Sequence, residues 1–181
     1  MSVAITYFVH GTTTDNEKGL ATGWNQGELS ELGKKQSQEL GEIVKDKKFD
    51  VVFCSDLKRA IDSAELSFQG KYHIIQDKRL REINYGDWNG TLGKNFKADL
   101  MKYLDEPFPG GESYKDVAVR VEDFLFFLKN NYNDQHVAIV SHHAPQLALD
   151  VLLQGKTWQQ AMDEDWRNTK NWQPGWEYIL K

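Results

Sequence analysis

The sequence has few features of a secreted, membrane-bound or disulfide-rich protein. Cys54 is the only cysteine among 181 residues, which excludes an intramolecular disulfide and fits a reducing compartment. The apolar runs are far shorter than the roughly 20 residues that span a membrane. The opening MSVAITYFVHG has neither the basic region nor the cleavage site of a signal peptide. We therefore predict a cytoplasmic protein with no membrane partner.

Cationic and metal-binding patterns are also scarce. The formal net charge is −5, and no block of lysine and arginine is interleaved with aromatic residues, so we expect no nucleic-acid partner. A local basic pocket for a small anion is compatible with this acidic chain. The sequence has no His-x-His, His-x-x-x-His or Gly-x-Ser-x-Gly spacing. This argues against a metal or other cofactor and against a serine hydrolase.

What the chain does have is a regular alternation of strand and helix patterns. Its length and its hydrophobic fraction of 40% suffice for one globular domain over residues 1–181. Apolar, strand-like runs predict strands at 4–9, 50–54, 72–76, 137–141 and 178–180. Helical patterns separate most of these runs. We therefore predict an α/β fold, a three-layer α/β/α sandwich with a mainly parallel central sheet.

Capping residues and apolar periodicity predict where the helices lie. Ser30 should cap a helix that ends near residue 46, and Ser55 or Asp56 should cap the next one. A helix is expected at 96–104, a long one after Ser113, and one from Pro145 to residue 153. Two helices have an apolar stripe that we expect to be buried: Leu32, Leu40, Ile43 and Val44 on the first, and Val117, Val121, Phe124, Leu125 and Leu128 on the long one.

Four short segments end in side chains that could handle a phosphate group, each where a strand-like run stops. His10 is followed by a glycine and three threonines, and a neutral imidazole has a lone pair that can attack phosphorus. Arg59 lies in the first turn of a helix, where a guanidinium and the helix dipole both favour an anion. Either residue could instead be structural, Arg59 by pairing with Asp62 or Glu65.

Glu82 and His142 complete this set. A carboxyl group held near phosphate oxygens should have a raised pKa, which suits a general acid. The alternative is a surface ion pair between Glu82 and Arg81. His142 ends the 137–141 strand, where it could stabilise the phosphoryl oxygens. Because neighbours in an extended segment point to opposite faces, we expect at most one of His142 and His143 to face the same ligand.

The last quarter of the chain is rich in tryptophan. It holds four of the six tryptophans: Trp158, Trp166, Trp172 and Trp176. We expect them to pack this segment onto the body of the protein, with a dimer contact or a lid over the site as the alternatives.

Taken together, the segments resemble the histidine phosphatase superfamily, the phosphoglycerate mutase-like group. HGTTTDN resembles its R-H-G-x-T-x-x-N opening, and SDLKRA, LREINYGDWNG, PGGES and VSHHAPQ follow in the family's order. The resemblance implies that His10 is the nucleophile and Glu82 the proton donor. It also implies that Arg59 and His142 bind phosphate, with Thr13 and Asn16 in the phosphate pocket and His143 beside it.

The sequence departs from the family pattern at two places. His143 stands where the family usually has glycine, and the arginine expected directly before His10 is missing. Val9 could have replaced this arginine, or the arginine could have been deleted. Deletion would shift the strand by one residue and would need a bulge to restore His10.

The resemblance implies a metal-independent phosphomonoesterase that acts through phosphohistidine on a small phosphorylated metabolite, with inorganic phosphate as product. The short segment between Trp88 and Pro109 favours a phosphatase over a phosphoglycerate mutase-type phosphotransferase. The missing arginine motivates another hypothesis, a catalytically impaired protein that binds or senses a phosphate ligand. The sequence does not predict the oligomeric state.

Overall fold

The computed structural model describes residues 2–169 and 173–181. A five-stranded sheet has the order β4-β3-β6-β1-β7, and β2 and β5 form a separate two-stranded sheet. The strands, in chain order, are β1 (Val3–Val9), β2 (Leu20–Ala21), β3 (Val51–Cys54), β4 (Ile74–Gln76), β5 (Thr91–Leu92), β6 (His136–Ser141) and β7 (Trp176–Leu180). The five predicted strands are confirmed, and the short β2–β5 pair was not predicted.

The central sheet is mainly parallel, as predicted. The strands β4, β3, β6 and β1 run parallel to their neighbours, while β7 is antiparallel to β1 at one edge. Pairing between β1 and β6 is continuous from Ala4 opposite His136 to Val9 opposite Ser141. The carboxyl ends of four strands therefore meet at one edge of the sheet, where open α/β sheets bind ligands.

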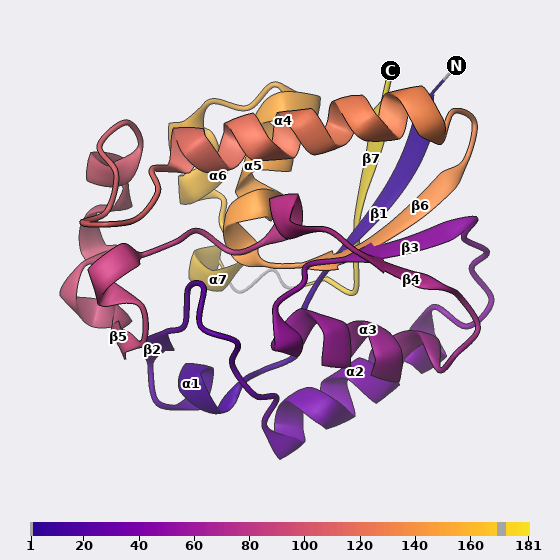
Figure 1. The fold of residues 1–181 in the computed structure, drawn as a ribbon, viewed down its shortest axis with the longest axis horizontal. Helices are drawn as coiled ribbons and strands as arrows, with labels where there is room; N and C mark the ends of the chain where they lie inside the picture. The colour runs from indigo at the N-terminus through magenta and orange to yellow at the C-terminus, as the bar shows by residue number, and fades with distance from the viewer. Residues whose placement is uncertain (1, 170–172) are drawn as a thin grey trace.

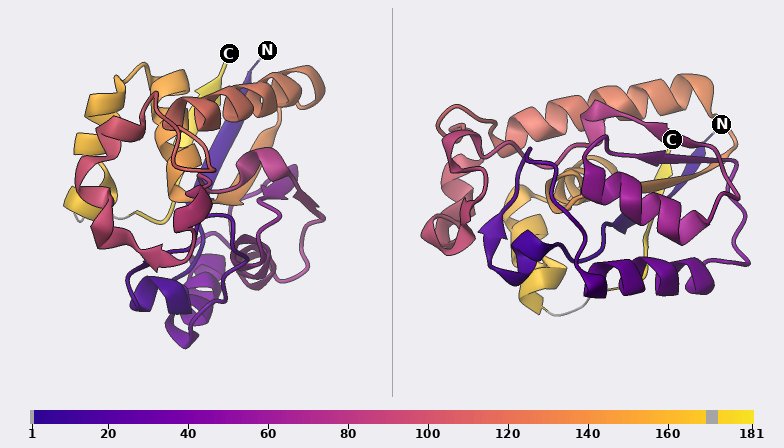
Figure 2. Two further views of the ribbon diagram at one scale, coloured as in Figure 1. Left: turned by 60° about the vertical axis from the view of Figure 1, so that its left-hand side comes forward. Right: turned by 60° about the horizontal axis from the view of Figure 1, so that its bottom comes forward.

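Helices cover both faces of the sheet (Figure 1), and the two further views show the same three layers (Figure 2). On one face lie α2 and α3, and on the other α4 and α5. The α-helices are α1 (Thr14–Glu17), α2 (Glu31–Ile43), α3 (Lys58–Phe68), α4 (Tyr114–Asn131), α5 (His143–Gln154), α6 (Trp158–Asp163) and α7 (Trp166–Thr169). Four 3₁₀ segments complete the fold: η1 (Lys78–Leu80), η2 (Gly86–Trp88), η3 (Gly93–Asn95) and η4 (Lys97–Tyr103).

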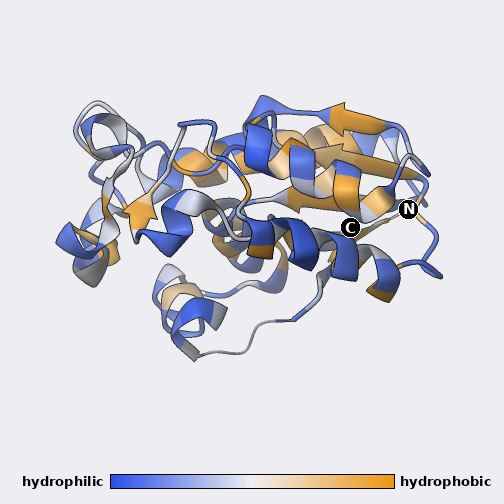
Figure 3. Ribbon diagram, turned by 90° about the horizontal axis from the view of Figure 1, so that it is seen from below, coloured by the Kyte–Doolittle hydropathy of each residue, from blue (hydrophilic) through white to orange (hydrophobic). Residues whose placement is uncertain are grey.

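Two apolar clusters hold these layers together, one on each face of the sheet. The larger includes Tyr7 of β1 and Phe124 of α4, and the smaller includes Phe8 of β1 and Phe68 of α3. Figure 3 shows the corresponding pattern, with apolar strands between helices whose outer faces are polar. The predicted stripe of α4 is confirmed, because all five of its residues are buried beneath the helix. Ser113 caps α4 through a capping box with Asp116.

The predicted stripe of α2 is confirmed for Val44, which is buried, and for Leu40, which packs against the smaller cluster; Ser30 does cap this helix. It is wrong for Leu32 and Ile43, which are 51% and 57% exposed. The residues that α2 itself buries are small ones: Gly33, Ser37 and Gly41. A Cβ atom at Gly33 would lie 1.9 Å from the Thr12 carbonyl oxygen, and one at Gly41 would lie 2.5 Å from that of Ser67. Main-chain atoms thus approach this face of α2 too closely for larger side chains.

Two other helix predictions need correction. The N-cap of α3 is Leu57, and Ser55 accepts only the Leu57 amide inside the preceding turn. The segment expected as a helix at 96–104 forms 3₁₀ turns, with a non-helical residue at Asp99. The helix predicted from about Pro145 to residue 153 is confirmed as α5, and Pro145 lies in its first turn.

The tryptophan-rich end packs against the body, as expected for three of its four tryptophans. Trp158 contacts Tyr114 edge-on, and Trp166 lies 6.1 Å from Trp176 between ring centres. Trp172 lies outside the described residues. Trp166 also lines the large cavity described below. Among the described helices, none has the length and apolar character needed to cross a membrane.

Candidate active site

The strand ends bring His10, Arg59, Glu82 and His142 to one place. His10 directly follows β1, and its amide donates to the Ser141 carbonyl oxygen at the end of β6. Arg59 is the second residue of α3, after β3, and Glu82 follows η1, after β4. His142 is the N-cap of α5. The four residues therefore lie in the connections that follow β1, β3, β4 and β6, the parallel strands of the central sheet.

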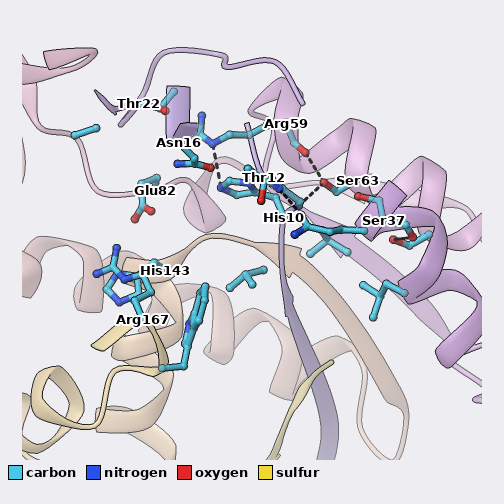
Figure 4. A pocket seen from close by; sticks show the side chains of 18 of the residues that line it. His10, Thr12, Asn16, Thr22, Ser37, Arg59, Ser63, Glu82, His143 and Arg167 are labelled. Carbon is cyan, nitrogen blue, oxygen red and sulfur yellow. Dashed lines mark hydrogen bonds between the residues drawn. The ribbon is translucent and has the colours of Figure 1, made fainter. Parts of the chain in front are cut away.

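The hydrogen bonds of His10 define its tautomer. Its Nδ1 lies 2.7 Å from the Gly11 carbonyl oxygen, so Nδ1 must carry the hydrogen. Nε2 then has a lone pair, which accepts the Nε–H of Arg59 at 3.3 Å (Figure 4). Burial and the charge of Arg59 lower the pKa of His10 from 6.5 to about 4. The imidazole is thus neutral near pH 7, and its Nε2 lone pair is engaged by the Arg59 Nε–H in the ligand-free site.

His142 lies behind His10. The two ring centres are 5.0 Å apart, and neither ring nitrogen of His142 has a hydrogen-bond partner among the described residues. The Tyr7 hydroxyl fixes its main chain, since it donates to the His142 carbonyl oxygen and accepts the His142 amide. Burial and the nearby charge of Arg59 hold the pKa of His142 well below 6.5. Buried imidazole nitrogens without partners are costly, and His142 is fully buried and does not line the cavity described below.

Arg59 is almost completely buried, with 1% of its surface exposed. Its Nη1 donates to the carbonyl oxygens of Asn25 and Gln26, and its Nη2 to that of Gly23. The alternative of a surface ion pair does not apply, because Asp62 pairs with Lys58. The loop before α2 therefore holds the guanidinium rigidly, and leaves Nε as the nitrogen that donates to His10.

Glu82 is also buried, and its main chain is held from two sides. The Glu82 carbonyl oxygen accepts the Trp24 Nε1 at 2.8 Å and an Arg120 Nη2 at 3.0 Å. Its Oε1 accepts the amides of Ile83 and Ala144, the latter in the first turn of α5. A surface pair with Arg81 is not present, since Arg81 binds Asp56.

The raised pKa expected of Glu82 applies to a site that holds a phosphate group, and the ligand-free site is different. Burial raises the pKa of Glu82, but the neighbouring His143, the two amides and Arg59 together outweigh burial and lower the pKa below 4.5. The ligand-free carboxyl is therefore ionised. The raised pKa that a general acid needs would have to come from a bound anion, because a phosphate dianion repels the carboxylate.

The threonine-rich loop after His10 is arranged differently from the expectation for Thr13. Thr13 is fully buried, and its hydroxyl accepts the Asn16 amide in the capping box of α1. Asn16 lines the cavity as expected, and it is Thr12 that joins it there. Gly11 is needed for packing, since a Cβ at this position would lie 2.4 Å from the Gly33 carbonyl oxygen. Thr13 thus supports the loop and does not line the cavity.

His143 faces the cavity from the opposite side of the site. Its Nε2 lies 2.8 Å from Oδ2 of Asp165, which is 3% exposed at its side chain. Asp165 also binds Arg167, through Arg167 Nε at 3.0 Å and Nη2 at 2.9 Å. Figure 4 shows Arg167 and His143 side by side below Glu82. Burial and Arg167 lower the pKa of His143, although Asp165 opposes them.

Sequence reasoning missed Arg167 and Thr22, which both line the cavity. Thr22 is buried and its hydroxyl has no partner among the described residues. Neither residue ends a strand, so the pattern that identified His10 and Arg59 could not find them. A single threonine between Ala21 and Gly23, and an arginine next to Trp166 in a four-residue helix, carry no signal of this kind.

One cavity of about 710 Å³ is lined by His10, Arg59, Glu82 and His143, and His142 lies outside its wall. Polar side chains line its inner part around His10, Arg59 and Glu82, while Leu40 and Ile43 of α2 form an apolar part with Val140. This volume exceeds what a phosphate group needs, so it leaves room for the rest of a larger ligand. In the described part of the chain, no group of three or more His, Cys, Asp or Glu residues could hold a metal ion.

Val9 occupies the place of the missing arginine without disturbing the strand. Its pairing with Ser141 continues the regular β1–β6 register, and the next amide, of His10, keeps the same partner. Strand β1 shows no bulge between Ala4 and Val9. The strand is thus undistorted up to the residue directly before His10.

A mainly parallel α/β sheet with a neutral histidine, a buried arginine and a buried carboxylate at its carboxyl edge is typical of enzymes that handle phosphate groups. The model of the histidine phosphatase superfamily (branch 1) matches residues 7–171. The chain therefore belongs to this superfamily, as the sequence resemblance indicated.

Relatives within the superfamily have two kinds of name. Phosphoserine phosphatase 1 of Hydrogenobacter thermophilus is 32% identical over 155 residues, covering 81% of this chain and 74% of that protein. A 2,3-bisphosphoglycerate-dependent phosphoglycerate mutase of Methylorubrum extorquens is 32% identical over 164 residues, covering 82% and 77%. The crystal structure of the alpha-ribazole phosphatase from Shigella flexneri superimposes with a TM-score of 0.77 at 26% identity, over 90% of this chain and 84% of that chain.

Proposed function

We propose that this protein is a phosphomonoester hydrolase that acts on a small phosphorylated metabolite through a phosphohistidine at His10. The observation that carries this proposal is the Nδ1 hydrogen bond of His10 to the Gly11 carbonyl oxygen, which leaves the Nε2 lone pair beside Arg59. A strand-end imidazole fixed in this tautomer is oriented as a nucleophile. Membership of a superfamily whose named relatives are phosphatases and mutases supports the same reading.

In the first step, Nε2 of His10 forms a bond to phosphorus while the ester P–O bond breaks. The Glu82 carboxyl group protonates the leaving oxygen. In the second step a water oxygen bonds to phosphorus, the N–P bond breaks, and Glu82 accepts the water proton. Arg59 and His142 stabilise the phosphoryl oxygens in both steps, and the products are an alcohol and inorganic phosphate.

The proton on Glu82 would arrive with the substrate. The free carboxyl is ionised, and its pKa is held low by His143, two amides and Arg59. A phosphate dianion in the pocket offsets the positive charge of Arg59 and repels the carboxylate of Glu82. Both effects raise the pKa of Glu82. Substrate binding and proton uptake are then linked, and the acid is generated next to the leaving oxygen.

Two other functions have a specific observation in their favour. A phosphoglycerate mutase-type phosphotransferase is supported by the names of several relatives, but the chain between Trp88 and Pro109 is short. A protein that binds phosphate without turnover is supported by Val9 in the place of the family's arginine. Both alternatives use the same pocket, so an activity assay separates them from the hydrolase.

The test is phosphate release from a panel of small phosphomonoesters in the presence of EDTA, with a His10→Ala variant as control. We expect release by the parent chain that EDTA does not diminish and that the variant lacks. Unchanged hydrolysis by His10→Ala would refute the mechanism. Transfer to a second phosphoglycerate without release would identify the mutase, and phosphate binding without turnover would identify the binding protein.

A further inference from the structure

The phosphate pocket, as built from the strand ends, is poor in positive charge. Arg59 has Nη1 and Nη2 committed to main-chain carbonyl oxygens, and the carboxylate of Glu82 offsets its charge. The pKa values of His10, His142 and His143 are all lowered, so these imidazoles are neutral near pH 7. The chain also lacks the arginine that the family places directly before the nucleophile. Among the groups at the strand ends, a bound phosphate dianion would therefore meet only one guanidinium, that of Arg59.

A second guanidinium does line the same cavity, and it comes from the C-terminal part of the chain. Arg59 and Arg167 are the arginines in the cavity wall among the described residues, and no described lysine is in this wall. Arg167 lies on α7, across the cavity from Arg59 and beside His143 (Figure 4). Its side chain is 31% exposed, so the charge is accessible from the cavity.

Val9 and Arg167 lie on the same side of the sheet. Ile5 and Tyr7 belong to the apolar cluster under α4 and α5, and Val9 packs against this cluster, as the alternation of β1 requires. Trp166, the neighbour of Arg167, packs against the cluster too. The side chain of an arginine at position 9 would thus project toward the wall from which Arg167 faces the cavity.

We propose that Arg167 binds the phosphate group of the substrate and takes the role of the arginine that is missing before His10. The inference rests on the proposed function for the identity of the ligand. Asp165 orients Arg167 through its Nε and Nη2, and Nη1 has no partner among the described residues. The same carboxylate binds His143, so the two side chains form one preoriented wall opposite His10.

The experiment measures binding of inorganic phosphate and of vanadate by calorimetry, together with kcat and KM on the best ester. Arg167→Ala is compared in two backgrounds, the parent chain and Val9→Arg. In the parent we expect phosphate binding about tenfold to a hundredfold weaker, the effect of one charged hydrogen-bonding group. In the Val9→Arg background we expect a loss below about threefold, because the restored arginine makes Arg167 dispensable.

Three controls separate this role from a structural one. Arg167→Lys should keep most of the phosphate affinity, because it keeps the charge. Arg79→Ala removes an arginine of comparable exposure that pairs with Asp77 and Asp123 and does not line the cavity, and should leave phosphate binding unchanged. Thermal melting verifies that each variant is folded. If Val9→Arg does not fold, the phosphate affinities of Arg167→Lys and Arg167→Ala in the parent chain test whether the charge of Arg167 binds phosphate.

Several outcomes would overturn the proposal: phosphate binding by folded Arg167→Ala equal to that of the parent, an equal loss in both backgrounds, or no phosphate binding by the parent. Failure of the proposed function is distinguishable. If no ester is hydrolysed while phosphate binds and Arg167→Ala weakens it, the hydrolase assignment fails and the assignment of Arg167 stands.

Discussion

At the scale of single residues, the site is defined by buried ionisable groups whose pKa values are shifted. His10 and His142 are buried as neutral imidazoles, and Glu82 is buried as an anion. Each of them is held by the main chain or by a neighbouring charge rather than by solvent. Their chemistry therefore depends on a few specific hydrogen bonds, and single substitutions can test it.

Arg59 should control the protonation of His10. We expect the pKa of His10 near 4 in the parent chain, and a shift upward toward 6.5 in Arg59→Met, because a positive charge 3.3 Å from Nε2 is removed. The measurement is a titration of the His10 imidazole by NMR. A His10 pKa near 6.5 in the parent would show that the imidazole is not held neutral as described.

Replacing Glu82 by glutamine should expose its role in protonating the leaving oxygen. Loss of a general acid costs about a hundredfold to ten-thousandfold in rate. We expect this loss for alkyl phosphates, whose leaving oxygen needs a proton, and a much smaller loss for nitrophenyl phosphate. Steady-state rates on the two ester types give the answer. An equal loss on both would assign Glu82 to positioning instead.

The residues of the site could be predicted only where a strand ends. His10, Arg59 and His142 follow β1, β3 and β6 closely, so the alternation of strand and helix patterns in the sequence is enough to locate them. The lowered pKa of Glu82 in the ligand-free site could not be predicted, because the Ala144 amide and Arg59 act on it from elements distant in sequence. Arg167 faces the same cavity only through tertiary packing.

At the scale of elements, the packing of α2 is the least expected feature. Strands and long helices were predictable, since their apolar periods match the faces they bury, as in α4. In α2 the period was misleading for Leu32 and Ile43, because the face that the helix buries is marked by Gly33, Ser37 and Gly41 rather than by large side chains. Close main-chain contact with the His10 loop and α3 leaves no signal in hydrophobicity.

Gly33→Ala should therefore destabilise the protein more than loss of a leucine from the same helix. A Cβ at Gly33 would lie 1.9 Å from the Thr12 carbonyl oxygen, so the His10 loop or α2 must move. Overpacking of this kind costs about 1–3 kcal/mol. Leu32→Ser, at a 51% exposed position, should change the free energy of unfolding by less than about 0.5 kcal/mol. Urea unfolding of both variants provides the comparison, and the reverse order would contradict this packing.

At the scale of the whole molecule, three buried neutral histidines make stability depend on pH. The folded-state pKa values of His10, His142 and His143 lie below 6.5, so the unfolded chain binds more protons at acid pH. Their contribution is present above pH 6.5 and is lost as the pH falls toward 4. Lowered pKa values of carboxylates such as Glu82 extend the loss below about pH 4.5.

We expect the free energy of unfolding to fall between pH 7 and pH 5, by up to about 1.4 kcal/mol per pH unit for each histidine below 6.5. His10→Asn should have a shallower dependence, because one titrating group is gone. Urea unfolding across this range measures both. A free energy of unfolding that does not change between pH 7 and pH 5 would mean that the histidines are not buried in the neutral form.

The two-step reaction through His10 has a direct signature in the stereochemistry at phosphorus. Two in-line displacements, first by Nε2 and then by water, each invert the phosphorus centre, so the net result is retention. The measurement is hydrolysis of a phosphomonoester with a chirally isotope-labelled phosphoryl group. Retention is the predicted result. Inversion would show that water attacks the ester directly, and His10 would then not be the nucleophile.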